Sequence, residues 1–255
     1  MPNMEFVVIT CGEPTTHLCL ASLRNEIDQS EIRVVQNVYP MSEAFNRVLE
    51  SSADWAVQVD ADFIFYRGFA RRFSDEITLA LEKERTDRLN IHAVTFSLYD
   101  PFEQRNIGWC KAFQMRHVRS AGIRFRNVSG CDMALMKEFA DRGYHVWRLP
   151  LNRPVGDHYL PTGEQLFSRW SEMVAKFGVA RIDQPLLDFW IDRVKNHRSP
   201  LHAAALLGML HPREERTERN RHEEMAHPIR QMIAGSTPDE LVSRTLDLLK
   251  KKDLV

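Results

Sequence analysis

The stretch ADWAVQVDADFIF, residues 53–65, is an apolar run that leads directly into two aspartates, Asp60 and Asp62. Such a run predicts a buried strand, and residues two apart on a strand point to the same side. The two carboxylates can therefore share one divalent cation. Hard oxygen ligands favour Mg²⁺ or Mn²⁺, and a phosphate or diphosphate commonly completes the coordination of such an ion.

The position of this Asp-x-Asp pair carries more information than its presence. The 16 aspartates of the 255-residue chain give about one such pair by chance. The pair follows an apolar strand, however, and ligands of open α/β sheets bind just outside the carboxyl ends of strands. The alternative is that the two aspartates cap a turn before Phe63.

The composition is that of a globular protein, with 44% hydrophobic and 27% charged residues. The length allows one large domain, or a domain with an appendage. A net charge of −1 argues against a nucleic-acid binder, which normally carries a basic surplus. The four cysteines lack C-x-x-C spacing, which indicates reduced thiols. Neither a secretory signal nor an apolar run long enough to cross a bilayer is visible, so we expect a cytoplasmic protein.

Strands and helices alternate on both sides of this central stretch. Residues 5–10 and 31–38 predict strands, and the apolar spacing over 18–27 and 42–49 predicts helices. Together with the strand that enters Asp60, this order implies a parallel, right-handed βαβαβ unit of a nucleotide-binding type. Further along, we predict a helix over 69–84, strands over 92–98, 108–115 and 144–149, and helices beginning near 128 and 162.

Two basic segments are open to two interpretations each. Five basic side chains over residues 116–126 can bind a diphosphate or an anionic acceptor, or they belong to a solvent-facing hairpin. The lysines at 250–252 either touch a membrane surface or an acidic partner, or they complement the dipole of a C-terminal helix. We expect no nucleic-acid partner.

In their order and spacing, these pieces resemble a glycosyltransferase of the GT-A fold, most closely the broad family-2 type. The matching features are the strand ending at Thr10, the segments 21–25 and 42–49, the strand entering Asp60 and Asp62, the helix start at 129–135, and Asp157-His158. The resemblance implies a Rossmann-like three-layer α/β/α mixed sheet over residues 1–178, followed by a helical extension over 179–255. It also implies transfer of a sugar from a nucleotide-diphosphate sugar to an acceptor hydroxyl.

The resemblance assigns metal and catalytic roles to particular residues. It implies that Asp60 and Asp62 bind Mn²⁺ or Mg²⁺ on the donor diphosphate and that His158 completes the metal coordination. The candidates for the general base are Asp132 and Asp157. Asp132, at a helix start, can instead interact with the helix dipole, and Asp157 can instead orient the residues that bind the metal.

The nucleotide-sugar site is expected at the ends of the first three strands. We assign to it Thr10, Glu13, Asn37, Asp60 and Ala61. The acidic motif that the family commonly has after its second strand is absent, because residues 36–39 read QNVY. The nucleotide of the donor, UDP or GDP, therefore stays open, as does the acceptor, whether sugar, lipid or small molecule.

Two other functions are compatible with the same sheet. A nucleotidyltransferase also uses carboxylate-bound Mg²⁺, but it normally has a Gly-rich basic loop after the first strand. Residues 11–14 read CGEP, with one glycine and no lysine. The third alternative is a non-catalytic binding protein on a degenerate GT-A scaffold, with the helical extension as its partner surface.

Overall fold

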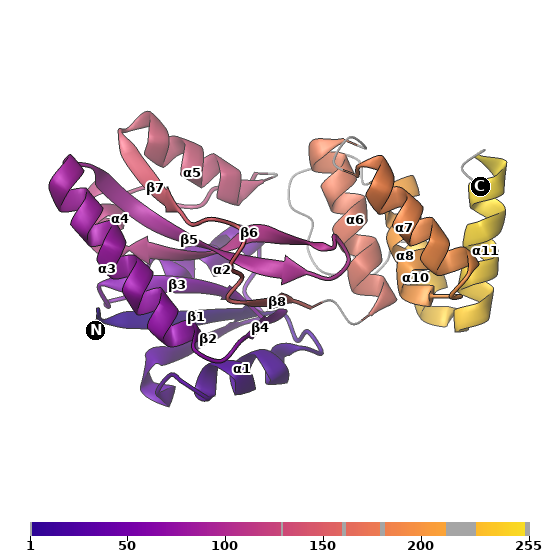
Figure 1. Cartoon of the computed structure of the whole chain (residues 1–255), viewed down its shortest axis with the longest axis horizontal. Coiled ribbons are helices and arrows are strands. Elements are labelled where there is room, and N and C mark those ends of the chain that lie inside the picture. Colours follow the sequence, from indigo (N-terminus) through magenta and orange to yellow (C-terminus); the bar gives the residue numbers. More distant parts are fainter. Residues whose placement is uncertain (1, 129, 160–161, 179–181, 213–227, 253–255) are drawn as a thin grey trace. The chain divides into compact units, whose positions relative to one another are not determined.

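The computed structural model describes the chain except for residues 1, 129, 160–161, 179–181, 213–227 and 253–255. The chain divides into two compact units, Met1–Tyr159 and Leu160–Val255. The first unit contains the sheet, and the second is helical (Figure 1).

Eight strands of the first unit form one mixed sheet in the described residues, ordered β2-β1-β3-β6-β5-β8-β4, with β7 paired to β5 outside this path. Three of them, β2, β1 and β3, are parallel, whereas β6 runs antiparallel to both β3 and β5. The strands are β1 Met4–Thr10, β2 Ile32–Gln36, β3 Trp55–Asp60, β4 Phe63–Phe65, β5 Asn90–Asp100, β6 Arg105–Gln114, β7 Tyr144–Arg148 and β8 Gly156–His158.

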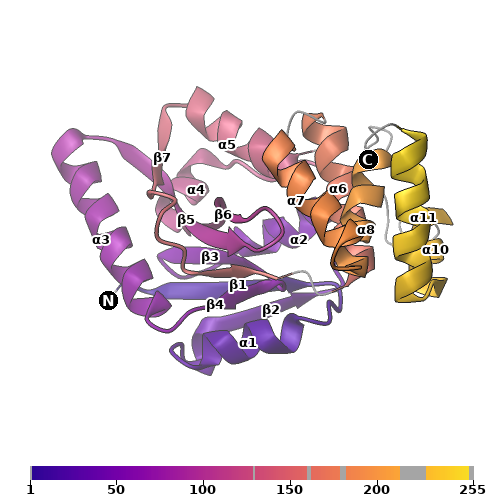
Figure 2. The ribbon, with the colours of Figure 1, turned by 45° about the vertical axis from the view of Figure 1, so that its right-hand side comes forward.

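Helices cover both faces of this sheet because its central strands are apolar on both sides. In β1, Phe6 and Val8 pack in one hydrophobic cluster with α1 and α3, whereas Val7 and Ile9 pack in another with α2, α4 and α5. Figure 2 shows α1 below the sheet, and α4 and α5 above it. These helices are α1 Thr16–Arg24, α2 Met41–Val48, α3 Phe69–Asp87, α4 Met115–Ala121 and α5 Cys131–Asp141. The predicted three-layer α/β/α mixed sheet is confirmed.

The sequence missed the two short strands that matter most for the site. Strand β4 begins directly after the turn at Ala61 and Asp62 and pairs antiparallel with β8, so that Phe63 lies opposite His158. Each strand has only three residues, too few for a periodic pattern to stand out. Their pairing is set by tertiary contacts between segments more than ninety positions apart.

The second unit is built from helices α6 Gly163–Phe177, α7 Gln184–Lys195, α8 Pro200–Leu210, α10 Pro228–Gly235 and α11 Pro238–Lys251. We expected the first domain to continue to residue 178, but the first compact unit ends at Tyr159, before α6 begins. The reason is that α6 packs closely against α8, where a Cβ atom added to Gly208 would lie 2.5 Å from the carbonyl oxygen of Phe167. Only glycine permits this approach of two helix backbones.

Replacing Gly208 by alanine should therefore destabilise the protein by about 1–3 kcal/mol, because the new methyl group meets helix backbone that cannot move aside. The measurement is the free energy of unfolding in urea. Gly235→Ala is the matched control, since nothing lies within 4 Å of a Cβ atom there, and alanine is the better helix former. Equal stability of the two variants would contradict the close α6–α8 contact.

Candidate functional site

The candidate site lies at the carboxyl ends of β1 and β3. Asp60 ends β3 opposite Ile9 of the parallel strand β1, and the amide of Ala61 donates to the Ile9 carbonyl oxygen at 3.1 Å. Asp62 follows, and its own carbonyl oxygen accepts a hydrogen bond from the amide of Tyr159 at 2.8 Å. The pairing of β4 with β8 thereby brings His158 beside the Asp-x-Asp pair.

His158 lies between two carboxylates and is almost fully buried. Its Nε2 atom is 3.2 Å from Oδ2 of Asp62, and its Nδ1 atom is 2.9 Å from Oδ2 of Asp100. The second carboxylate oxygen of Asp62, Oδ1, is buried and has no hydrogen-bond partner among the residues that the structure describes. A buried carboxylate oxygen without a donor is costly unless a ligand satisfies it.

Asp60 is held in an environment that opposes its ionisation. Burial and then the adjacent charge of Asp62 raise the pKa of Asp60 to about 6. The positive charge of Lys111 acts in the opposite direction, as does a 3.5 Å hydrogen bond from Gln58. Two carboxylates crowded at one strand end are the situation that a divalent cation relieves.

Lys111 joins this strand end to the start of α5. It is buried on β6, directly beside Gln58 of β3, and its Nζ atom is 3.7 Å from Oδ2 of Asp132. The ammonium group of Lys111 thus lowers the pKa of Asp60 and also contacts Asp132. Asp132 lies in the first turn of α5, where the helix dipole also favours a negative charge.

The two candidates for the general base are placed differently. Asp157 precedes His158 on β8, and successive residues of a strand point to opposite faces. The Asp157 carboxylate accepts a hydrogen bond from the hydroxyl of Tyr66, on the side away from the His158 ring. Asp132 is therefore linked to Asp60 through Lys111. The Asp157 carboxylate is instead directed toward Tyr66.

The loop after β1 adds another acidic side chain, that of Glu13, to the site. Oε2 of Glu13 accepts hydrogen bonds from the Thr10 hydroxyl at 2.6 Å and from the amide of Cys11 at 2.8 Å. The amide of Asn37, which has a left-handed φ of 55°, donates to the Thr10 carbonyl oxygen at 2.9 Å. Thr10 therefore links the ends of β1 and β2.

The carboxylates of Asp60, Asp62 and Glu13 all affect the pKa of one buried thiol, that of Cys19. Burial raises the pKa of Cys19, and the charges of Asp62, Asp60 and Glu13 raise it further. The predicted residues of the first and third strand ends are thus gathered in one region.

The basic segment over 116–126 has structural partners. It forms α4 and the following loop rather than a hairpin. Its basic side chains contact carboxylates and backbone carbonyl groups of unit 1: Arg116 and His117 contact Glu84, Arg119 bonds to Ser51 and Ala53, Arg124 to Asn46, and Arg126 pairs with Glu138. These side chains fasten α4 and its loop to α2, α3, α5 and the loop before β3, and the same contacts do not involve Asp60 or Asp62.

The residues of the site fit a divalent metal, although the described residues contain no preformed group of three metal-binding side chains. Carboxylate oxygens and one imidazole suit Mn²⁺, and carboxylates suit Mg²⁺. The Oδ1 atom of Asp62 is unsatisfied among the described residues, and the Oδ2 atom of the same carboxylate lies 3.2 Å from Nε2 of His158, so two such ligands lie side by side.

Three residues of the site were missed by the sequence reasoning: Gln58, Asp100 and Lys111. Asp100 ends β5 as Asp60 ends β3, so the same strand-end signal could have found it. Gln58 and Lys111 are polar residues inside predicted apolar strands. Such residues mark a special environment, but they do not reveal which groups they face.

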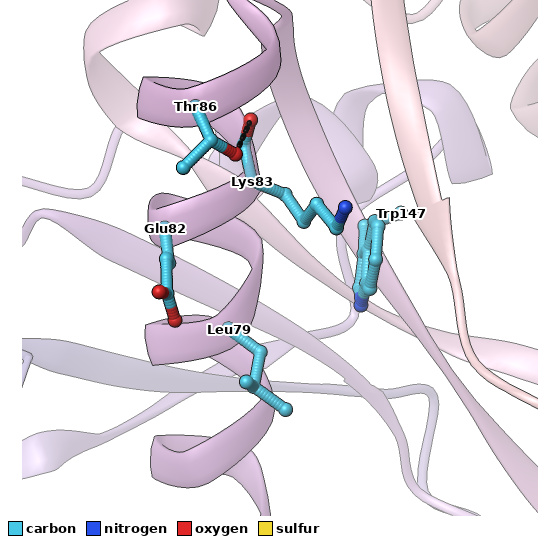
Figure 3. Close-up of a pocket in the computed structure, with 5 residues that line it drawn as sticks. All are labelled: Leu79, Glu82, Lys83, Thr86 and Trp147. Carbon is cyan, nitrogen blue, oxygen red and sulfur yellow. Dashed lines mark hydrogen bonds between the residues drawn. The ribbon is translucent and has the colours of Figure 1, made fainter.

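A separate surface hollow of about 310 Å³ lies between α3 and β7 (Figure 3). Its lining residues are Leu79, Glu82, Lys83, Thr86 and Trp147. Neither the Asp-x-Asp pair nor any other predicted site residue lines it. This hollow is therefore distinct from the candidate site at the strand ends.

Comparisons with known proteins give similarity in structure alone. No protein-family model matches the chain, and no curated protein matches it in sequence. The mannosyltransferase PcManGT from Pyrobaculum calidifontis, solved with GDP-Man and Mn²⁺, is 15% identical, with a TM-score of 0.48 over 97% of this chain and 80% of that one.

A second similar structure is S. aureus TarS 1–349, which is 12% identical, with a TM-score of 0.49 over 98% of this chain and 92% of that one. The same protein in complex with UDP is 9% identical over the same shares of the two chains, with a TM-score of 0.46. At such identities a similar fold does not fix an activity, which depends on the residues of the site. Within the described part of this chain, no helix has the length and apolar character needed to span a membrane.

The raised pKa of Asp60 predicts that this residue destabilises the metal-free protein at neutral pH. The unfolded chain ionises Asp60 near its ordinary pKa of 3.8, whereas the folded chain does so near 6, so stability falls as the pH rises through this window. Asp60→Asn should then be more stable than the wild type at pH 7, by on the order of 1–3 kcal/mol, and should lose this advantage at pH 4.

The free energy of unfolding in urea at both pH values, with a chelator present, tests this expectation. Asp54→Asn is the control, because Asp54 is exposed near the start of the same strand. A less stable Asp60→Asn variant at pH 7 would show that the carboxylate is satisfied without metal.

Proposed function

We propose that this protein is a metal-dependent glycosyltransferase that moves a sugar from a nucleoside-diphosphate sugar, linked to UDP or GDP, to an acceptor hydroxyl. The observation that carries this proposal is the Asp62 carboxylate, just past the carboxyl end of β3 and next to Asp60. Its buried Oδ1 atom has no hydrogen-bond partner among the described residues, and its Oδ2 atom lies 3.2 Å from Nε2 of His158. This is the edge of an α/β sheet where ligands bind.

Asp60, Asp62 and His158 are the residues that would hold Mn²⁺ or Mg²⁺ in this protein. When bound, such an ion offsets the charge of a diphosphate and stabilises it as a leaving group. Burial and then repulsion from Asp62 raise the pKa of Asp60. This supports the assignment, because a cation at the pair would offset both effects.

The ends of β1 and β2 would hold the nucleoside part of the donor. Thr10, Glu13 and Asn37 are already tied to one another by backbone and side-chain hydrogen bonds. A site fixed before the ligand arrives loses less entropy on binding. Ala61 lies between the two aspartates, and its buried side chain and its hydrogen bond to Ile9 fix the backbone that carries the pair.

Asp132 is the general base that the contacts favour. In the proposed step, the acceptor hydroxyl gives its proton to Asp132 as its oxygen bonds to the anomeric carbon of the sugar. The bond from that carbon to the diphosphate breaks, and the nucleoside diphosphate leaves with the electron pair. Lys111, 3.7 Å from Asp132, positions this carboxylate and adds positive charge near the leaving group. The alternative base, Asp157, is held by Tyr66.

We also infer a cytoplasmic location. No disulfide joins the four cysteines, and three of them are buried in the sheet and its helices. Such thiols are typical of proteins from a reducing compartment. The acceptor is proposed as a hydroxyl-bearing sugar, lipid or small molecule.

The donor site predicts metal-dependent nucleotide binding that needs both aspartates. Calorimetric titration of UDP and GDP, with and without Mn²⁺, should give binding in the wild type. Asp60→Asn and Asp62→Asn should lose the metal-dependent part, because each removes a charged ligand. Asp54→Asn, an exposed aspartate of the same segment, should bind as the wild type does. Unchanged affinity in both site variants would refute the metal assignment.

The base assignment predicts a separation of binding from turnover. Asp132→Asn should bind nucleotide with wild-type affinity but hydrolyse the UDP- or GDP-sugar, with water as acceptor, about 10²–10⁴-fold more slowly. The measurement is release of free sugar under saturating donor. Asp157→Asn is the parallel variant, and it should keep wild-type turnover. If Asp157→Asn were slow and Asp132→Asn normal, the base would be Asp157.

A further inference from the structure

Asp100 is buried at the end of β5 and has a fixed orientation. One of its oxygens, Oδ1, accepts hydrogen bonds from the amides of Phe102 at 2.8 Å and Glu103 at 2.9 Å. The other oxygen, Oδ2, lies 2.9 Å from Nδ1 of His158. Since backbone amides can only donate, they hold the carboxylate with one oxygen toward the loop and the other toward the imidazole.

This orientation determines which ring nitrogen of His158 carries a proton. A carboxylate bound by two amide donors acts as an acceptor, so Nδ1 must donate to Asp100. The other nitrogen, Nε2, then faces Oδ2 of Asp62 at 3.2 Å. Without a proton, Nε2 presents a lone pair to a carboxylate, and only a proton or a cation between the two makes that contact favourable.

We propose that Asp100 is a positioning residue that keeps the proton of His158 on Nδ1 and thereby presents Nε2, beside Asp62, as a metal ligand. Metal-binding histidines generally donate their other ring N–H to such a carboxylate. This inference rests on the proposed function for the identity of the ligand, but the state of Nδ1 can be measured without any ligand.

The Asp100→Asn variant tests this role with almost no change in shape. The carboxamide oxygen can still accept from the amides of Phe102 and Glu103, which leaves its NH₂ group facing Nδ1 of His158. An NH₂ group is a donor, so Nδ1 must become the acceptor and the proton must move to Nε2. The Nε2 proton would then point at Asp62 and occupy the position of the metal.

The first readout is the ¹⁵N NMR shift of His158 in metal-free protein at neutral pH. In the wild type, Nδ1 should have the ¹⁵N shift of a protonated ring nitrogen. In Asp100→Asn, it should have the shift of an unprotonated ring nitrogen. A bare Nδ1 in the wild type would overturn the proposal, and this measurement does not depend on whether the variant folds. The same Nδ1 state in both proteins would overturn it as well.

The second readout is Mn²⁺ affinity in the presence of UDP or GDP, measured by calorimetry. We expect Asp100→Asn to bind Mn²⁺ about 10–100-fold more weakly than the wild type; equal affinity would overturn the proposal. Glu84→Gln is the matched control, because Glu84 of α3 is also a buried carboxylate that contacts a histidine, His117 of α4, away from the candidate site. It should change neither the His158 spectrum nor the metal affinity.

The two readouts separate the inference from the function on which it rests. If wild-type protein failed to bind Mn²⁺ with either nucleotide, the proposed metal site would be refuted, and with it the ligand role of Nε2. The effect of Asp100 on the ring proton would still be decided by the NMR measurement.

Discussion

The repulsion between Asp60 and Asp62 is the constraint around which the rest of the site is arranged. Both follow a buried strand, and burial together with the second charge raises the pKa of Asp60 to about 6. The neighbouring groups offset this cost: Lys111 supplies a positive charge, and Gln58 donates a hydrogen bond. A protein that keeps two such carboxylates together loses stability, which is the usual sign of a site that serves a ligand.

The sheet provides the partners of these carboxylates from distant parts of the chain. The antiparallel strand β6 places Lys111 beside the end of β3, and from there Lys111 reaches Asp132 of α5. The short pair β4–β8 carries His158 to Asp62, and the end of β5 adds Asp100 behind the imidazole. The result is one connected network whose side chains come from four strands, one helix and the turn after β3, so its geometry is held largely by the sheet.

Neighbouring residues of the chain have separate roles in this arrangement. Asp157 and His158 are adjacent in sequence, yet only His158 faces the Asp-x-Asp pair, because strand residues alternate between the two faces. The basic segment after β6 is another example. Its arginines bind carboxylates and carbonyl groups of the fold, so its positive charge fixes α4 to neighbouring helices and to the loop before β3 and is not directed at the two aspartates.

The sequence by itself determined the parallel half of the sheet, its helices on both faces, and the position of Asp60 and Asp62 at a strand end. These features follow from local patterns, namely apolar runs and helical spacing. Only the tertiary structure decided which distant groups meet these aspartates: His158, Asp100 and Lys111 arrive through strand pairing between segments far apart in the chain. Strand register also decided between Asp157 and His158, since a three-residue strand has no pattern from which its facing can be predicted.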